Sequence, residues 1–302
     1  MQRNHQENMI AKDQSTVRPQ LVVRKIDFNL KDGINPVWNP KRPEWSHMVN
    51  GASLTMPYLE PFLIRSMSEG LKLISDDQLR DDVRKFNAQE GQHFQHHRRY
   101  NDMLKAKGYP ELGEVEQLMA ADYARFQNKS LKWKLAYAAG FETMTVGITE
   151  WLVNDRQFLF GGADQNVSSF VLWHMVEETE HKNVAIDLYN HLYRKDYFAR
   201  IKGILIASLH VVKYSRKAYI RMLKNDGLWK KLSSRKELWK MVVRFGLKVS
   251  PIMFKSLAPN YHPSKIKDPE WVQKWIDSYN DLPADLVPIL DTRDPQIPPL
   301  FT

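Results

Sequence analysis

The sequence predicts an all-α protein, a bundle of four long helices with additional helices at the C-terminal end. Three observations predict this class. From about residue 53 onward, apolar residues recur at the three-, four- and seven-residue spacing of amphipathic helices. Glycines such as Gly108 and Gly161 end the long periodic segments, as C-terminal helix caps do. A single longer connection falls in the middle, as in bundles with a crossover.

The elements follow in order along the chain. Residues 1–52 are expected to form a polar tail and an irregular lead-in, with a short apolar patch of some strand character at residues 22–28. Prolines and tryptophans at residues 36–45 favour an extended segment over a helix. Ser75 and the acids after it predict the start of the second long helix. The long helices are expected at about 53–71, 76–107, 131–160 and 166–194, with a crossover at 111–129.

The domain organisation follows from these elements and from the charge. We expect a bundle domain at residues 53–194 and a basic helical extension at 195–302, packed on the bundle and ending in a Pro-rich tail. The 302 residues carry 44 Lys+Arg and 35 Asp+Glu, a net charge of +9. Between residues 194 and 255, 17 basic and 3 acidic residues sum to +14, so the rest sums to −5.

Composition also excludes several kinds of protein. The chain has no Cys, which excludes disulfide scaffolds, cysteine zinc fingers and thiol nucleophiles. The polar N-terminal residues lack the apolar core of a secretory signal. The longest apolar run, residues 203–212, is about half the ~20 residues that span a membrane. We therefore expect a cytoplasmic protein.

Two segments carry metal-ligand residues at helical spacing. The segment QEGQHFQHH contains Glu90, His93 and His97, and WHMVEETEH contains His174, Glu178 and His181. At about 100° per residue, each set of three spans roughly 60° of its helix face, so its members point the same way. Glu-x-x-His occurs in both segments.

The other two bundle helices each contain one acid on an apolar face, Glu60 and Glu142. A lone buried carboxylate costs several kcal/mol or takes up a proton, and a divalent cation removes this difficulty. Ferritin-like dinuclear-metal proteins have this arrangement of ligands: one acid on each of two helices, and Glu-x-x-His on each of the other two. Such oxygen-rich ligands predict two iron ions, with manganese or zinc as alternatives.

Several residues have a second interpretation. Pro61 would also suit a helix start, with Glu60 facing solvent. His174 is either a further metal ligand or a residue that orients a carboxylate. The remaining expectations concern residues near the ligand faces. We expect His97, Asn101 and Tyr189 to contact ligands, and His96 to lie on the surface. Three further acids are expected either to face solvent or to contact ligands: Glu177, Glu180 and Glu150.

The strings SLTMPYLEPF, FNAQEGQHFQHHRRYN, FETMTVGITEWL and WHMVEETEHKNVAIDLY resemble the motifs of the bacterial family of predicted metal-dependent hydrolases. The resemblance runs from about Trp38 to the end of the fourth helix. Family members usually carry Gly-Glu at the first acid, where this chain has Leu59-Glu60. The order Glu142, His174, Glu178, His181 is also similar to that of di-iron N-oxygenases, by analogy only.

The expected activity is that of an O₂-activating di-iron oxidase or oxygenase, with Glu90 and Glu178 bridging the irons. The alternatives are hydrolysis of an ester or phosphoester by a metal-bridging water, and, ranked low, iron storage. A small apolar, amine or lipid-like substrate would lie against Leu63, Met67, Val146 and Thr149. The basic extension is most simply a set of solvated helix faces, and its composition also suits peripheral contact with an anionic membrane at the inner surface. We expect no nucleic-acid partner. Oxygenation would require an external electron donor. The sequence is also compatible with a homodimer.

Overall fold

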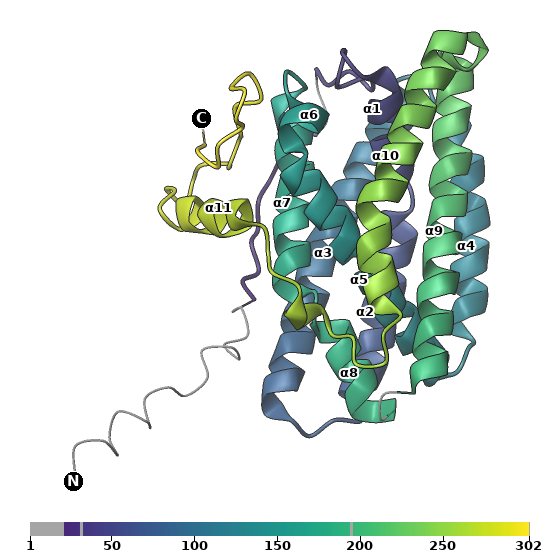
Figure 1. The fold of residues 1–302 in the computed structure, drawn as a ribbon, viewed down its shortest axis with the longest axis vertical. Helices are drawn as coiled ribbons and strands as arrows, with labels where there is room; N and C mark the ends of the chain where they lie inside the picture. The colour runs from purple at the N-terminus through teal and green to yellow at the C-terminus, as the bar shows by residue number, and fades with distance from the viewer. Residues whose placement is uncertain (1–20, 31–32, 194–195, 302) are drawn as a thin grey trace.

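The computed structural model describes residues 21–30, 33–193 and 196–301. All regular secondary structure in these residues is helical, and none of them forms a β-strand (Figure 1). This confirms the all-α class. The apolar patch at residues 22–28 is extended but unpaired, so its expected strand character is wrong. Every second side chain of this segment is buried between residues 24 and 30.

Four helices form the central bundle, and a fifth connects them. They are α2 (Met56–Leu71), α3 (Asp77–Ala106), α5 (Leu131–Asn154) and α7 (Gln165–His181), with α4 (Leu112–Gln127) in the crossover. Helix α2 packs against α3 and α5, and α7 packs against α3 and α5. Each bundle helix therefore contacts two others across a shared interior (Figure 1).

Side-chain caps start three of these helices. The carboxylate of Asp76, rather than Ser75, accepts from the backbone N–H of Leu79 at 2.9 Å. Asp164 accepts in the same way from Val167 at 3.0 Å, and Ser130 caps α5. These polar side chains satisfy amides that the first helical turn leaves unpaired.

A proline lies inside α2, where it removes a backbone donor. Pro61 has no N–H, so the carbonyl of Pro57 loses its helical partner. The guanidinium of Arg98 on α3 donates to that carbonyl at 3.3 Å. Because Arg98 replaces the missing bond, the helix continues through Pro61, and Glu60 is buried at 1% exposure. The solvent-facing interpretation of Glu60 is therefore wrong.

The lead-in to the bundle contains a helix that the sequence does not predict. Helix α1 (Pro43–Ser53) begins with Pro43 in its first turn. Proline is tolerated there because the first helical N–H groups have no partner within the helix. Residues 33–42 form no helix, but they bend at residues 36–37 and turn at residues 40–41, where the N–H of Arg42 donates to the carbonyl of Asn39 at 3.0 Å. The expectation of an extended segment is therefore wrong.

The third and fourth long helices are shorter than expected. Helix α5 ends at Asn154 and a short helix α6 (Arg156–Phe160) follows, with Asp155 between them. Helix α7 ends at His181, and α8 (Val184–Tyr193) begins after Asn183, whose carbonyl accepts from the N–H of Asp187. Asn and Asp interrupt helices readily because their side chains compete for backbone hydrogen bonds.

The C-terminal region adds helices to the outside of α5. They are α9 (Tyr197–Asn225), the short η2 (Leu228–Lys230), α10 (Leu232–Ser256), η3 (Pro263–Lys265) and α11 (Glu270–Asn280). Helices α9 and α10 both pack on α5, whereas α11 contacts α7 (Figure 1). None of the described helices is both long and apolar enough to cross a membrane.

Two glycines allow α5 and α9 to cross at close range. A Cβ atom at Gly140 would lie 2.5 Å from the backbone of Gly203, and one at Gly203 would lie 2.0 Å from the carbonyl oxygen of Ala136. Any side chain at either position would clash with backbone atoms. This crossing places α9 beside the bundle interior.

Candidate metal centre

Seven acidic and imidazole side chains meet inside the bundle, and each is at most 5% exposed. Helix α2 supplies one of them, α3 two, α5 one and α7 three, because the Glu-x-x-His spacing turns each helix's residues to one side. They are Glu60, Glu90, His93, Glu142, His174, Glu178 and His181. The bundle therefore brings together all seven predicted ligand positions.

Among the described residues, these side chains and His97 form four overlapping groups, and two of the groups share only the carboxylate of Glu90. The groups with His174 are Glu60, His97 and His174, and His93, His174 and Glu178. One ligand atom each of Glu60, Glu90 and His93 lies within 4.8 Å of the others. The same holds for the group of Glu90, Glu142, Glu178 and His181. Each of the two groups that share Glu90 has the composition of a site for one cation. We call the seven side chains, without His97, the ligand cluster.

The polar atoms that point into the cluster lack hydrogen-bond partners. Both carboxylate oxygens of Glu60 and of Glu90 are buried without a partner in the described structure. One oxygen of Glu142, one of Glu178, Nδ1 of His93 and Nε2 of His181 are also unpaired. Buried polar atoms are almost always satisfied, and unpaired ones call for a bound water or ion as their partner. Eight such atoms around one point fit the ligand set of bound cations.

Electrostatics leads to the same conclusion. Burial, together with Glu90 and Glu178, raises the pKa of Glu60 well above its usual range, and burial raises the pKa of Glu90 to about 8. Burial also raises the pKa of Glu142 well above the usual range. Although burial alone would raise it, His181 and His174 hold the pKa of Glu178 low. So many carboxylates cannot all ionise together without added positive charge.

Hydrogen bonds outside the cluster orient two of the imidazole rings. Nε2 of His93 lies 2.9 Å from a carboxylate oxygen of Glu177. Nδ1 of His181 lies 3.0 Å from the amide oxygen of Gln89. In each ring the other nitrogen is unpaired and faces the cluster, as in metal sites where an outer partner selects the tautomer.

A buried arginine from the N-terminal segment holds these outer partners. Arg24 is 2% exposed and pairs with Glu180 at 2.7 Å and with Glu177 at 3.2 Å. Its guanidinium also lies over the ring of Trp275 on α11. Gln89 donates to Glu180 at 2.9 Å, so the same network reaches both oriented histidines.

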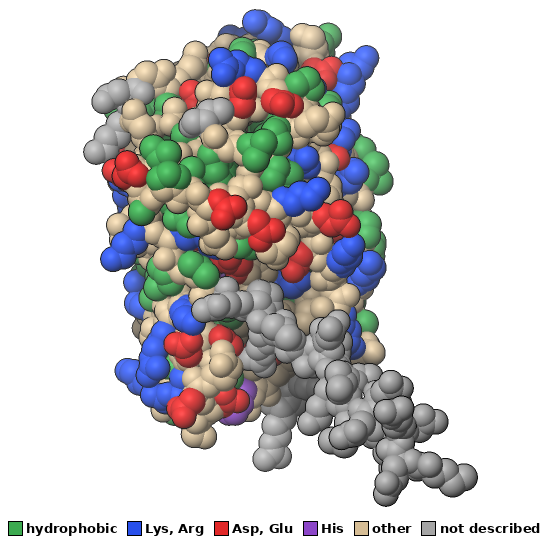
Figure 2. Space-filling view, turned by 90° about the vertical axis from the view of Figure 1, so that its left-hand side faces the viewer, with side chains coloured by type: hydrophobic (Ala, Val, Ile, Leu, Met, Phe, Trp, Pro, Cys, Tyr) green, Lys and Arg blue, Asp and Glu red, His purple; other side chains and the backbone are tan. Residues whose placement is uncertain are grey.

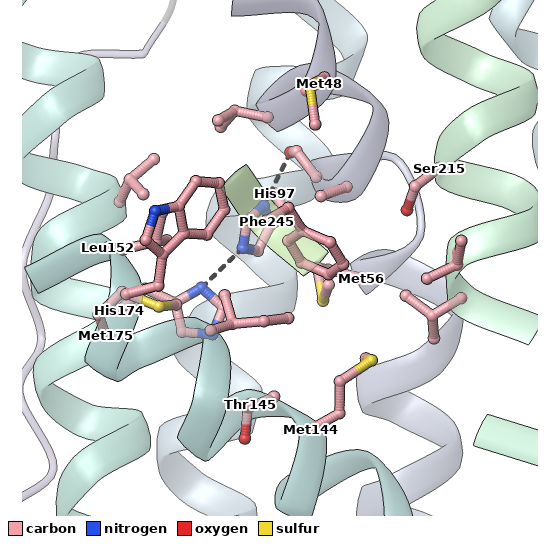
Figure 3. Close-up of a pocket in the computed structure, with 18 of the residues that line it drawn as sticks. Met48, Met56, His97, Met144, Thr145, Leu152, His174, Met175, Ser215 and Phe245 are labelled. Atoms are coloured by element: carbon pink, nitrogen blue, oxygen red, sulfur yellow. Dashed lines mark hydrogen bonds between the residues drawn. The ribbon is translucent and has the colours of Figure 1, made fainter. Parts of the chain in front are cut away.

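On the other side of the cluster, a chain of hydrogen bonds leads from α1 to α7. Nδ1 of His97 lies 2.8 Å from the hydroxyl of Ser53, and its Nε2 lies 2.9 Å from Nδ1 of His174 (Figure 3). Nε2 of His174 lies 2.9 Å from Glu178. Asn101 accepts from the Ser53 hydroxyl at 2.9 Å. His174 thus has both ring nitrogens paired, unlike His93 and His181.

Three further sequence expectations can be compared with the structure. His97 contacts His174, and its Nε2 lies 4.0 Å from Glu60, so it reaches the cluster. The hydroxyl of Tyr189 instead donates to the carbonyl of Asp196, because Tyr189 lies on α8, past the break after His181. His96 is 1% exposed and contacts the carbonyl of residue 26 at 2.7 Å, so its expected surface position is wrong.

A cavity of about 230 Å³ adjoins the cluster on the side of His174 and Glu178. Its walls are largely apolar and come from α1, α5, α7, α9 and α10 (Figure 3). The four residues predicted to line the pocket do not line this cavity. Leu63 and Met67 are fully buried in the core, and Val146 and Thr149 line a separate small cleft. The prediction used helix periodicity alone, which does not show where α9 and α10 pack.

Sequence reasoning missed three residues that support the cluster, namely Arg24, Gln89 and Ser53. For Glu177 and Glu180, the structure shows the second of the two expected positions: both are buried, Glu177 pairs with the ligand-cluster residue His93, and Glu180 pairs with Arg24. A signal for Arg24 does exist, because it takes a place in an alternating buried series with Ile26 and Phe28. No local pattern distinguishes Gln89 or Ser53.

The fold and the cluster define a helical-bundle protein with a buried carboxylate and imidazole site able to hold metal ions. The family model described as "predicted metal-dependent hydrolase" matches residues 22–267, and the chain belongs to this family. No curated protein and no solved structure matches the chain. The matched range covers α1 to α10 and so includes the whole ligand cluster.

Proposed function

We propose that the ligand cluster binds two iron ions and that the protein oxidises a small apolar or lipid-like molecule with O₂. Glu60, Glu90 and His93 would hold one ion, and Glu142, Glu178 and His181 the other, with Glu90 and Glu178 between them. His174 is proposed as a seventh ligand. Its pairing with Glu178 and His97 also fits a residue that orients the carboxylate. Manganese or zinc would fit the same donors.

One observation supports oxidation most strongly: the cavity shares His174 and Glu178 with the ligand cluster. A substrate in this cavity would therefore lie directly against the ligands. The adjoining side chains include Met144, Phe170 and Phe245, which exclude water and offer few hydrogen bonds. A dry apolar site suits reactions whose reactive species must be kept from water.

The proposed reaction inserts one oxygen atom of O₂ into a C–H or N–H bond of the substrate. The second oxygen atom leaves as water, which requires two electrons and two protons from an external donor. Reduced iron supplies the electrons that activate O₂, which amino-acid side chains do not do. The residues of the chain bind the substrate, hold it beside the ligands and keep water out.

The second candidate is hydrolysis of an ester or phosphoester, which the description of the family favours. In this case, cations held by the ligand cluster would make a water molecule acidic enough at neutral pH to attack the ester or phosphoester. Such an enzyme needs no O₂ and no reductant. It would also need polar groups for the ester, and Thr145, Ser215 and Arg216 are among the few that the cavity wall offers.

One experiment separates the two candidates. Protein loaded anaerobically with Fe²⁺ is exposed to O₂, and O₂ uptake and visible absorption are recorded. We expect uptake and a transient chromophore in the wild type, and neither in Glu90→Ala. Glu114→Ala, at an exposed acid of α4, is the matched control. Turnover of nitrophenyl esters without O₂ and without iron oxidation would overturn the oxidase in favour of the hydrolase.

A further inference from the structure

Helices α9 and α10 each carry a row of exposed apolar side chains. The row on α9 is 43–81% exposed and consists of Phe198, Leu205, Leu209 and Val212. The row on α10 is 54–75% exposed and consists of Leu232, Trp239, Val243, Leu247 and Phe254. Steps of three, four and seven residues keep each row within about 80° of its helix face. We call these two rows the α9–α10 face.

The rows point away from the rest of the protein. Both helices pack on α5 through their opposite sides, where Ile204, Ala207 and Met241 are buried. In Figure 1, α9 and α10 run antiparallel on the same side of the molecule. Apolar rows of this length on an outer surface are unusual in a soluble monomer and mark an interaction site.

Positive charge accompanies the apolar rows. Lys202 and Arg216 on α9 and Lys236 on α10 are exposed and form no ion pair with any described residue. They belong to the segment between residues 194 and 255, which has 17 basic and 3 acidic residues. By contrast, acidic and basic side chains are interspersed on the face that Figure 2 shows. The partner of the α9–α10 face should therefore be anionic.

The cavity extends to this same face. Val212 and Arg216 belong both to its lining and to the exposed side of α9. Val242 and Phe245 line it from α10, Ser215 lines it from α9, and His174 lines it from α7 (Figure 3). Each helix packs more extensively against α5 than against the other. A path between α9 and α10 thus connects the exposed rows with the ligand cluster.

We infer that the α9–α10 face docks on an anionic lipid bilayer and that the cavity receives an apolar chain from it. The docking surface stands on its own observations, whereas the use of the cavity rests on the proposed function. Helices with an apolar row and basic flanks lie in the membrane interface, with the apolar side chains among the acyl chains. Arg216, at the outer end of the cavity, would remain at the level of the phosphates.

Two other partners fit the face less well. A second copy of the chain would place the unpaired cations of one subunit against those of the other, because a twofold interface joins identical surfaces. A nucleic acid would suit the charge, and the aromatic side chains Phe198, Trp239 and Phe254 could stack on bases, but the six aliphatic side chains of the rows would find no apolar surface on it. An anionic bilayer is complementary to both the charge and the apolar rows.

Binding to vesicles tests the docking surface without metal or O₂. The full-length protein is sedimented with vesicles of phosphatidylcholine alone and with vesicles that also contain phosphatidylglycerol. We expect binding only to the second kind, and a fall of about fivefold for each of Lys202→Gln and Lys236→Gln, as expected for one cation at an anionic surface. Leu209→Glu should abolish binding. Leu73→Glu, at an equally exposed leucine on another part of the chain, should not.

A second measurement shows whether the face enters the bilayer. Brominated acyl chains quench tryptophans within the membrane, so they should quench the wild type and lose most of this effect in Trp239→Phe. Equal binding to both kinds of vesicle would overturn the inference. So would a stable dimer that Leu209→Glu dissociates, or binding of duplex DNA that Leu209→Glu leaves intact. Because vesicle binding needs no iron, failure here would leave the proposed oxidation untouched, and failure of the oxidation would leave the docking surface untouched.

Discussion

Nε2 of His93 lies 2.9 Å from a carboxylate oxygen of Glu177, while Nδ1 of the same ring is buried, unpaired and turned toward the ligand cluster. The hydrogen bond selects the tautomer with the proton on Nε2, so the lone pair on Nδ1 is available to a cation. Glu177 in turn is held by Arg24. The N-terminal segment therefore takes part in shaping a site whose proposed ligands all lie in the bundle.

Loss of Glu177 should weaken metal binding although Glu177 is not a proposed ligand. We expect Glu177→Ala to lower the affinity about 10–100-fold, the usual effect of removing a partner of a metal-bound histidine. Glu177→Gln should retain part of the affinity, because its amide oxygen still accepts from His93. Titration of the metal-free proteins with Fe²⁺ or Mn²⁺ measures this, with Glu114→Ala as the control. Equal affinities in all four proteins would show that the ring needs no outer partner.

The shared position of Glu90 leads to a prediction about metal content. Glu90 belongs both to the group with Glu60 and His93 and to the group with Glu142, Glu178 and His181, and it is the only residue that these two groups share. We therefore expect about two metal ions in the wild type, about one in Glu60→Ala and in Glu142→Ala, and close to none in Glu90→Ala. Elemental analysis of purified protein gives these ratios. One remaining ion in Glu90→Ala would mean that the groups are independent.

The close crossing of α5 and α9 predicts opposite effects for two glycine substitutions. Gly203→Ala should lower the free energy of unfolding by about 1–3 kcal/mol or more, because the new methyl group meets the carbonyl oxygen of Ala136. Gly246→Ala on α10 should raise it by about 0.5–1 kcal/mol, because nothing lies within 4 Å of its Cβ position and alanine favours helix. Urea unfolding measures both changes. A Gly203→Ala variant as stable as the wild type would show that the crossing can widen freely.

Acid should destabilise the contact between α4 and α9 around His210. Burial, with Lys213 and Arg125 nearby, lowers the pKa of His210 to about 4, although Asp122 lies 3.3 Å from its Nε2. Tyr137 contacts the other ring nitrogen. The unfolded chain, in which the histidine has a pKa of about 6.5, then binds more protons than the folded one, so stability falls as the pH drops from 6.5 towards 4.

The full shift corresponds to at most about 3 kcal/mol, and the effect should be smaller because His210 is partly exposed and Asp122 favours its charged form. Unfolding of the wild type and of His210→Gln across this pH range measures it, and the variant should show a smaller slope. Parallel slopes for the two proteins would assign the acid sensitivity to other groups.

The positions of most helices and of all seven proposed ligands could be predicted from the sequence, because both depend on local spacing. Glu90 and His93 share a helix face whatever surrounds the helix, and the same holds for Glu178 and His181. An acid on an apolar face, as at Glu142, indicates a buried charge that needs a partner. These signals need no knowledge of how the helices are arranged.

Other features depended on contacts between distant segments. The sequence around Pro61 was also compatible with the start of a helix. In the structure α2 continues through Pro61, because Arg98 from α3 donates the hydrogen bond that the proline nitrogen cannot. The partners of His93 and His181 are Glu177 and Gln89, and Arg24 holds Glu177. The distances between these residues in the sequence follow no pattern. The prediction of the pocket walls was wrong for the same reason, since side chains from α9 and α10 complete the cavity together with α1, α5 and α7.

The sequence alone thus determined the all-α class and the faces on which the acidic and imidazole side chains lie, because helical periodicity converts spacing directly into direction. Only the tertiary structure decided which ring nitrogens face the cluster, where the cavity lies and which surface it reaches. Those properties arise from packing between elements far apart in the chain, and the free energy of that packing is not encoded in any single segment.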